Sequence, residues 1–136
     1  MLNNTGIVKE TGLAPVQILA NVEMQAAVSV VVGNTGLTAD TNGKKILKAG
    51  TPISGNLEAR NTAFVKATTT KGSDGAADTS NAVGILLHDV DVTAGNNNGS
   101  CLIFGFVNLS RLDATTAALI DTATKTALNM IKFIKD

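Results

Sequence analysis

The chain has no tryptophan, no tyrosine and a single cysteine, and each of these scarcities excludes a class of site. Proteins that bind bases or sugars usually stack them on aromatic side chains, so such a binding platform fits this sequence poorly. The single cysteine, Cys101, excludes an intrachain disulfide and a zinc site built on cysteines. Because Cys101 precedes the apolar run Leu102-Ile103-Phe104, we expect a buried, unreactive thiol.

Charge and titratable groups are equally sparse. Eleven basic and eleven acidic residues give a formal net charge of zero, so the sequence has no electrostatic footprint for nucleic acid or an acidic membrane. The one histidine, His88, cannot supply a multi-histidine metal site, and no phosphate-binding loop, nucleophile elbow or metalloprotease motif is present. We expect no enzyme, no cofactor and no metal. An enzymatic site assembled around His88 and Asp91 is the weakest alternative.

The segment Thr68–Ser80 predicts a long loop, because it has no large apolar residue and is rich in glycine and aspartate. Its aspartates Asp74 and Asp78 are conceivable calcium ligands, together with Asp89 and Asp91. The spacing lacks the alternating oxygen ligands and closing glutamate of an EF-hand loop. A solvated loop tip is therefore the better interpretation.

The densest apolar stretch predicts a β-hairpin. Its strands are Ala82–His88 and Ser100–Leu109, and its turn lies in the Asn- and Gly-rich segment Asp89–Gly99. The strands are almost continuously apolar, so the hairpin is buried on both sides, or on one side against a partner. Gly84 and Gly105 interrupt the strands and predict a bulge, a tight barrel bend or the close approach of another backbone.

Shorter strands are expected upstream. Ala26–Val32 is β-branched and apolar, which is a strong strand signal. The segments Lys44–Ala49, Ile53–Leu57 and Ala63–Ala67 predict three more short strands. Pro52 lacks a main-chain donor, so we expect it in a turn and not within a sheet.

The N-terminal residues 1–25 predict an arm that becomes ordered on binding, followed by one β-rich domain over residues 26–136. Within the arm, Gly6-Ile7-Val8-Lys9 could add one short strand to a neighbouring sheet edge, although a frayed terminus is an equally good interpretation. Leu13–Met24 has helical spacing after Pro15. The chain shows no secretory signal and no membrane-spanning apolar run, so we expect a protein made in a reducing cytoplasm.

The C-terminal part predicts helices. Asp113 and Asp121 are good N-caps for two short helices, although one longer helix also fits the apolar spacing. Ile131–Ile134 predicts a closing edge strand, with a continuous helix as the alternative. The expected fold class is mainly β (α+β): a small β-barrel or sandwich-like domain with an N-terminal arm, short C-terminal helices and a final edge strand.

Five runs of sequence together resemble the head decoration and head fibre proteins of tailed bacteriophages, a group that includes the lambda-type capsid decoration family. The resemblance covers Lys48–Asp136, while the first 43 residues match only in position, as an arm. The runs consist of packing and turn patterns without a signature of chemistry. They are KAGTPISGNL (Lys48–Leu57), AFVKA (Ala63–Ala67), NAVGILLHDVDVT (Asn81–Thr93), FGFVNLSRL (Phe104–Leu112) and LIDTATKTALNMIKFIKD (Leu119–Asp136).

This resemblance implies a homotrimer on the outer surface of the virion, at threefold or quasi-threefold positions. Its partner there is the major capsid protein, whose neighbouring subunits it staples in the expanded head. As a hypothesis, the capsid contacts are Asn3, Asn4, Thr5, Gly6, Ile7, Val8, Lys9 and Glu10. A second hypothesis assigns packing of the protomer core or the trimer axis to Val83, Ile85, Leu86, Leu102, Ile103, Phe104, Phe106 and Val107.

A head fibre or adhesin is the alternative to a decoration protein. In that case the domain is anchored to the capsid and an exposed loop such as Thr68–Ser80 binds glycans or a cell-wall polymer on the host surface. The lack of tryptophan and tyrosine argues against a typical sugar site.

Overall fold

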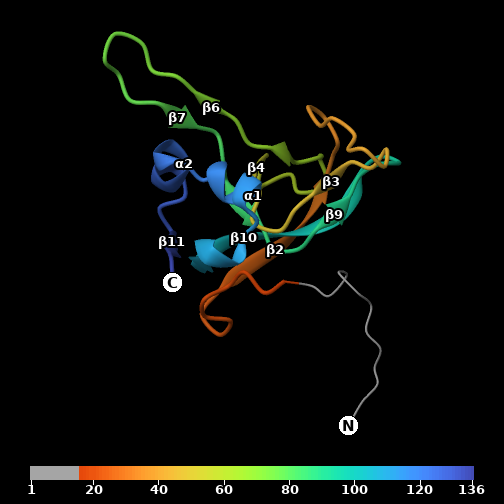
Figure 1. Ribbon diagram of the computed structural model, residues 1–136, viewed down its shortest axis with the longest axis horizontal. Coiled ribbons are helices and arrows are strands. Elements are labelled where there is room, and N and C mark those ends of the chain that lie inside the picture. Colours follow the sequence, from red (N-terminus) through yellow and green to blue (C-terminus); the bar gives the residue numbers. More distant parts are fainter. Residues whose placement is uncertain (1–15) are drawn as a thin grey trace.

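A computed structural model describes residues 16–136, and the residues before Val16 lie outside the description. The domain is mainly β, with two short helices and a final strand near the C-terminus, which confirms the predicted fold class (Figure 1). The main sheet has the strand order β11-β10-β8-β4-β5, and β2 also pairs with β10. Its strands are β2 (Ala26–Val32), β4 (Pro52–Ser54), β5 (Val65–Lys66), β8 (Gly84–Leu86), β10 (Asn97–Asn108) and β11 (Ile131–Ile134).

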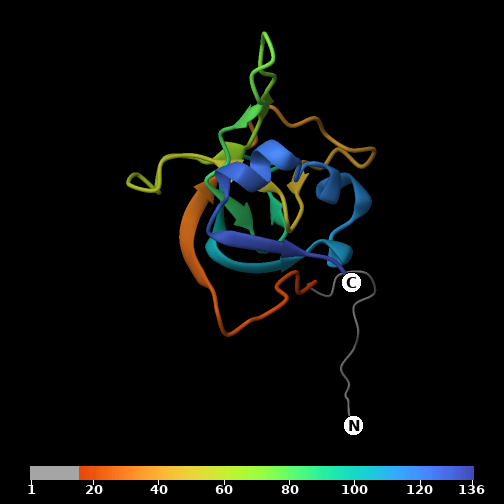
Figure 2. The same cartoon turned by 90° about the vertical axis from the view of Figure 1, so that its left-hand side faces the viewer.

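The sheet closes into a small barrel where the end of β2 meets the residue before β5. Val32 and Phe64 form a parallel bridge. On either side of it, the Phe64 N–H donates to the Val31 carbonyl at 2.7 Å, and the Gly33 N–H donates to the Phe64 carbonyl at 2.8 Å. The ring of neighbours is therefore β2, β10, β8, β4, β5 and back to β2, as the end-on view suggests (Figure 2).

The predicted hairpin is present and is buried on both faces. In the antiparallel pairing of β8 with β10, Leu86 lies opposite Cys101, and Ile85 lies opposite Leu102. All four side chains are fully buried, because successive residues of a strand point to opposite faces and each face has its own core. The barrel interior contains Val30, Val32, Leu47, Ile53, Phe64, Leu86, Val90, Val92 and Cys101. The outer cluster contains Ile18, Leu19, Ala82, Ile85, Leu87, Leu102, Val107, Leu109, Leu112, Ile120, Leu128 and Ile131.

The outer cluster is covered by C-terminal elements that the sequence predicted. A 3-10 turn (Leu109–Arg111) leads to α1 (Ala114–Ala118) and α2 (Thr122–Ala127). Two short helices form, and not one long helix, because each has its own aspartate cap at 2.8 Å from a main-chain N–H. Within residues 16–136, no helix is both long and apolar enough to cross a membrane.

The final strand confirms the predicted edge. β11 runs parallel to β10, with Gly105 opposite Ile131 and Asn108 opposite Ile134, at one end of the sheet order. The alternative of a continuous helix is wrong, since α2 ends at Ala127 and Leu128 leaves the helical region with φ −99° and ψ 57°. Leu128 and Ile131 are both buried, so the chain turns here to cover the outer cluster.

Two predicted loops contain short strands. Val90–Asp91 (β9), within the predicted turn of the hairpin, pairs with Ile46–Leu47 (β3). Val90 is only 5% exposed, and its side chain packs in the barrel interior although the surrounding segment is polar. In the predicted loop Thr68–Ser80, residues Thr69–Thr70 (β6) pair with Thr79–Ser80 (β7). Threonine is β-branched and favours such pairing even without burial.

The predicted helix over Leu13–Met24 is wrong for its described residues. From Val16 onward the chain is irregular, and it follows the free edge of β10: the Ala20 N–H donates to the Phe106 carbonyl, and the Asn108 N–H donates to the Ile18 carbonyl. A sheet edge that satisfies these main-chain groups overrides a weak helical pattern. This segment was assigned to the arm, yet Ile18 belongs to the outer cluster.

Pro52 also departs from the prediction, because it begins β4 and is not confined to a turn. The first residue of a strand tolerates proline, since only one main-chain group must pair there. The Pro52 carbonyl accepts a hydrogen bond from the Ala67 N–H at 2.9 Å, and Pro52 lies opposite Ile85 in the sheet.

The two glycines of the hairpin have the predicted roles. A Cβ atom on Gly84 would collide with the Cys101 sulfur and lie 2.6 Å from the Leu102 carbonyl oxygen. Gly105 has φ +153° and follows a register shift in the β2–β10 pairing between Leu102 and Phe104. Gly84 therefore permits close approach of a backbone, and Gly105 marks a bulge.

Substitution of Gly84 tests this close packing. Gly84→Ala should lower the free energy of unfolding by about 3 kcal/mol, because the added methyl overpacks a rigid ladder. Gly75→Ala is the matched control, since nothing lies within 4 Å of that position, although its φ is +84°. Its cost should be about 1 kcal/mol. Chemical denaturation compares the two, and equal losses would contradict the packing argument.

The helix caps predict a pH dependence. The Thr116 N–H donates to Asp113, which lowers the pKa of that carboxyl from its ordinary value. A lowered folded-state pKa adds stability above the unfolded pKa, and this stability is lost as the pH falls through the folded pKa. Asp113→Ala should cost about 1 kcal/mol at pH 7, and this difference should shrink below about pH 4. Asp113→Asn keeps a capping side chain that does not ionise, so it should cost little at pH 7 and should gain stability relative to the wild type as the pH falls below about 4, as measured by urea unfolding at several pH values.

Candidate interaction surfaces

An apolar groove lies where the start of β2 meets the segment between α2 and β11. Its volume is about 600 Å³, and none of its lining residues is charged. Two lining side chains are large and solvent-exposed, Leu57 by 39% and Met130 by 60%. The lining residues are Ala26, Leu57, Ala82, Val83, Ile103, Phe104, Ala127, Leu128, Asn129 and Met130.

Gly105 allows the two sides of this region to approach β10. Its N–H donates to the Met130 carbonyl at 3.3 Å. A Cβ atom at Gly105 would lie 3.4 Å from the Met24 carbonyl oxygen, and its φ of +153° disfavours other residues. The bulge thus brings the chain before β2 and the chain before β11 next to the same point on β10.

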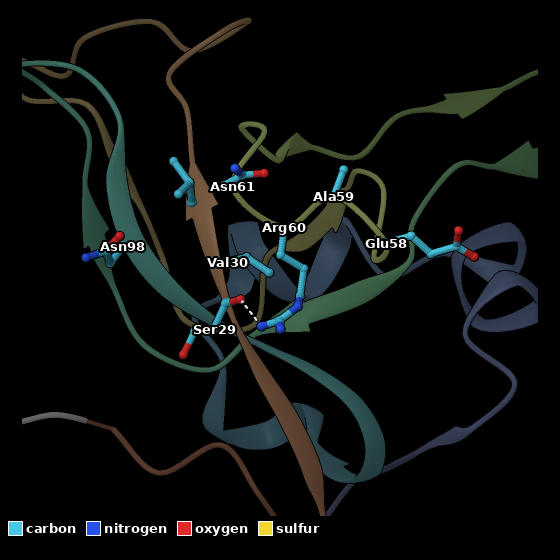
Figure 3. A pocket seen from close by; sticks show the side chains of 8 residues that line it. Ser29, Val30, Glu58, Ala59, Arg60, Asn61 and Asn98 are labelled. Carbon is cyan, nitrogen blue, oxygen red and sulfur yellow. Dashed lines mark hydrogen bonds between the residues drawn. The ribbon is translucent and has the colours of Figure 1, made fainter.

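A second, polar groove of about 440 Å³ lies along the outer edge of β2 (Figure 3). The Val31 N–H donates to the Arg60 carbonyl, and the Val31 carbonyl accepts from Phe64, so both groups point away from β10. Main-chain groups alternate along a strand, so those of Ala27 and Ser29 point the same way. Within residues 16–136 no strand pairs with Ala27 or Ser29 on that side. There the Arg60 Nη1 donates to the Ser29 carbonyl at 2.9 Å.

The β6–β7 hairpin extends away from the barrel (Figure 1). Asp78 accepts a hydrogen bond from the Gly72 N–H and one from Lys71 Nζ, each at 3.0 Å, and these hydrogen bonds lower the pKa of its carboxyl. At the base, Thr69 Oγ1 donates to Asp121 Oδ2 at 3.0 Å, which ties the hairpin to α2. The β6–β7 hairpin is therefore a polar projection that is held by its own hydrogen bonds.

His88 and Asp91, the residues of the enzymatic alternative, and the neighbouring Asp89 are all exposed, and the two aspartates stabilise loops. Asp89 accepts the Ala49 N–H at 2.8 Å, and His88 is exposed. Asp91 accepts hydrogen bonds from Thr93, which lower the pKa of its carboxyl. Asp89 and Asp91 border different hollows. Among residues 16–136, no three histidine, cysteine, aspartate or glutamate side chains are grouped so that they could hold a metal ion.

Cys101 is buried, as the sequence predicted. It has no exposed surface, and burial raises the pKa of its thiol to about 11. The thiol is therefore protonated at neutral pH, and a protonated thiol is a poor nucleophile.

The predicted contact residues divide into three groups. Asn3–Glu10, predicted to bind the capsid, lie outside the described residues. Ile85, Leu86, Leu102 and Val107 are fully buried within the protomer. The third group is only partly buried and lies at the surface. Val83, Ile103 and Phe104 line the apolar groove, and Phe106 lies outside its lining.

Sequence reasoning missed Leu57 and Met130 as surface residues, because Leu57 ends the expected strand Ile53–Leu57 and Met130 adjoins the apolar Ile131, so both look like core positions. No signal in the sequence separates these two positions from core positions. Comparison with known proteins adds no further assignment: a scan against protein-family models and a search of curated proteins found no match to this chain.

The role of Arg60 at the edge of β2 is testable. Arg60→Ala removes the side-chain bond to Ser29 but keeps the Arg60 carbonyl that accepts from Val31, so the stability should change by less than about 1 kcal/mol. The opened strand edge should make the protein aggregate faster under agitation. Lys135→Ala removes the same charge elsewhere and is the control. Light scattering measures both, and equal aggregation rates would refute the assignment.

Proposed function

We propose that the protein is a structural component of a tailed-bacteriophage virion that binds the outer surface of the capsid as a homotrimer. It stabilises the expanded head by stapling neighbouring subunits of the major capsid protein. The observation that carries the proposal is the exposed apolar groove, whose lining has no charged residue, because such a surface serves contact between proteins. The resemblance of Lys48–Asp136 to phage decoration and head fibre proteins supplies the kind of partner.

The N-terminal arm supplies the capsid contact in this proposal. Its root is fixed, because Ile18 and Leu19 are buried against β10. Fifteen residues precede Val16 and reach at most about 50 Å when fully extended. Gly6-Ile7-Val8-Lys9 would add a short strand to a sheet edge of a capsid subunit. Three arms on one trimer would bind with avidity, since each bound arm raises the effective concentration of the others.

Removal of the arm tests the capsid contact. A chain that lacks residues 1–11 should lose co-sedimentation with mature heads, because the proposed capsid contacts at Asn3–Glu10 are missing. Its thermal midpoint and circular dichroism should match those of the full chain, since Ile18 and the outer cluster remain.

The same assay includes unexpanded proheads, to which the full chain should bind weakly if its docking edge forms on expansion. Full-strength binding of the truncated chain to mature heads would refute the arm as the capsid contact. Failure of the full chain to bind any head would refute the proposed function.

A host-binding fibre or adhesin domain remains the second candidate. The observation that favours it is the projecting β6–β7 hairpin, whose polar tip is held by Asp78. Retention of the purified protein on host cells, without binding to heads, would favour this candidate.

A further inference from the structure

The turn before β2 presents two apolar side chains to solvent. Val22 is 52% exposed and Met24 is 53% exposed. The turn is held by its own polar groups: Asn21 Oδ1 accepts the N–H groups of Glu23 at 2.9 Å and Met24 at 3.3 Å, and Gln25 Nε2 donates to the Val22 carbonyl. These bonds fix a small apolar projection, here called the 21–25 turn. It extends from the body of the domain (Figure 2).

The 21–25 turn and the apolar groove lie side by side on one subunit. Gly105 is close to the Met24 carbonyl on one side and donates to the Met130 carbonyl on the other. Ala26, which follows the turn, also lines the groove. A head-to-tail contact between two different patches forms a closed ring when the rotation from one copy to the next closes.

We propose that the 21–25 turn of one subunit inserts Val22 and Met24 into the apolar groove of the next and so forms the trimer. This inference rests on the homotrimer of the proposed function and assigns its interface. The occupant is a second copy of this chain, because the chain itself carries an apolar projection to match its uncharged groove.

Charge at the margins agrees with this occupant. Glu23 lies between the two apolar residues of the turn and is exposed. The groove segment Ala127–Met130 is bracketed in sequence by exposed Lys125 and Lys132. Exposed Glu58 directly follows the lining residue Leu57, so two lysines and one glutamate flank the groove in sequence. A turn inserted from the neighbour would bring its acidic group to a margin with a net positive charge. Opposite charges at the rim of an interface favour the correct register.

Sedimentation equilibrium of the full chain, without capsids, tests the interface. The wild type should have three times the mass of the 13.9 kDa chain. Met24→Lys and Met130→Lys each place a charge in the contact and should weaken assembly by about 30-fold or more. Ile46→Lys alters another exposed apolar residue, opposite Asp91 in β3–β9, and should keep the wild-type mass.

A double variant tests the head-to-tail pairing. Met24→Lys with Met130→Glu on one chain should restore the trimer, because each subunit then offers a lysine to its neighbour's glutamate. Circular dichroism and the thermal midpoint check that every variant is folded.

Each result supports or overturns the interface. A single-chain mass for the wild type would overturn it, as would trimers in both lysine variants or a loss of assembly in only one of them. Capsid co-sedimentation is measured separately. A wild type that binds heads without forming trimers would refute this interface and leave capsid binding in place. A trimer that binds no head would refute capsid binding and leave this interface in place.

Discussion

The close contact between β8 and β10 is the constraint on which the rest of the domain depends. Gly84 lets the Cys101 side chain and the Leu102 backbone approach β8, and the ladder then separates two cores. Leu86 and Cys101 fill the barrel, while Ile85 and Leu102 form the base of the outer cluster. Because these side chains alternate between two buried faces, a register slip of one residue would exchange their environments.

Much of the fold was predictable where the signal was local. The bounds of β2, the caps Asp113 and Asp121 and the edge strand Ile131–Ile134 all follow from neighbouring residues. Predictions were wrong where a distant partner decided the conformation. The chain at Ile18 is not helical because β10 offers hydrogen bonds to it, and no local pattern carries that information.

The candidate surface was less predictable than the fold. The apolar groove is assembled from five separate parts of the chain, and its exposed residues Leu57 and Met130 are 73 positions apart, so no local pattern connects them. Sequence patterning identified Val83, Ile103 and Phe104 as apolar, but it could not tell a core position from the floor of a groove. That distinction depends on which element covers a strand.

The position of β10 in the chain has a kinetic consequence. This strand pairs with β2, β8 and β11, yet it begins only at Asn97. During synthesis, β2 leaves the ribosome long before β10, the strand that joins it to β8, is available. The barrel therefore cannot close early, and its formation awaits contacts between residues far apart in sequence, a topology associated with slow folding. The apolar segment Ala26–Val32 stays without its partner for most of that time.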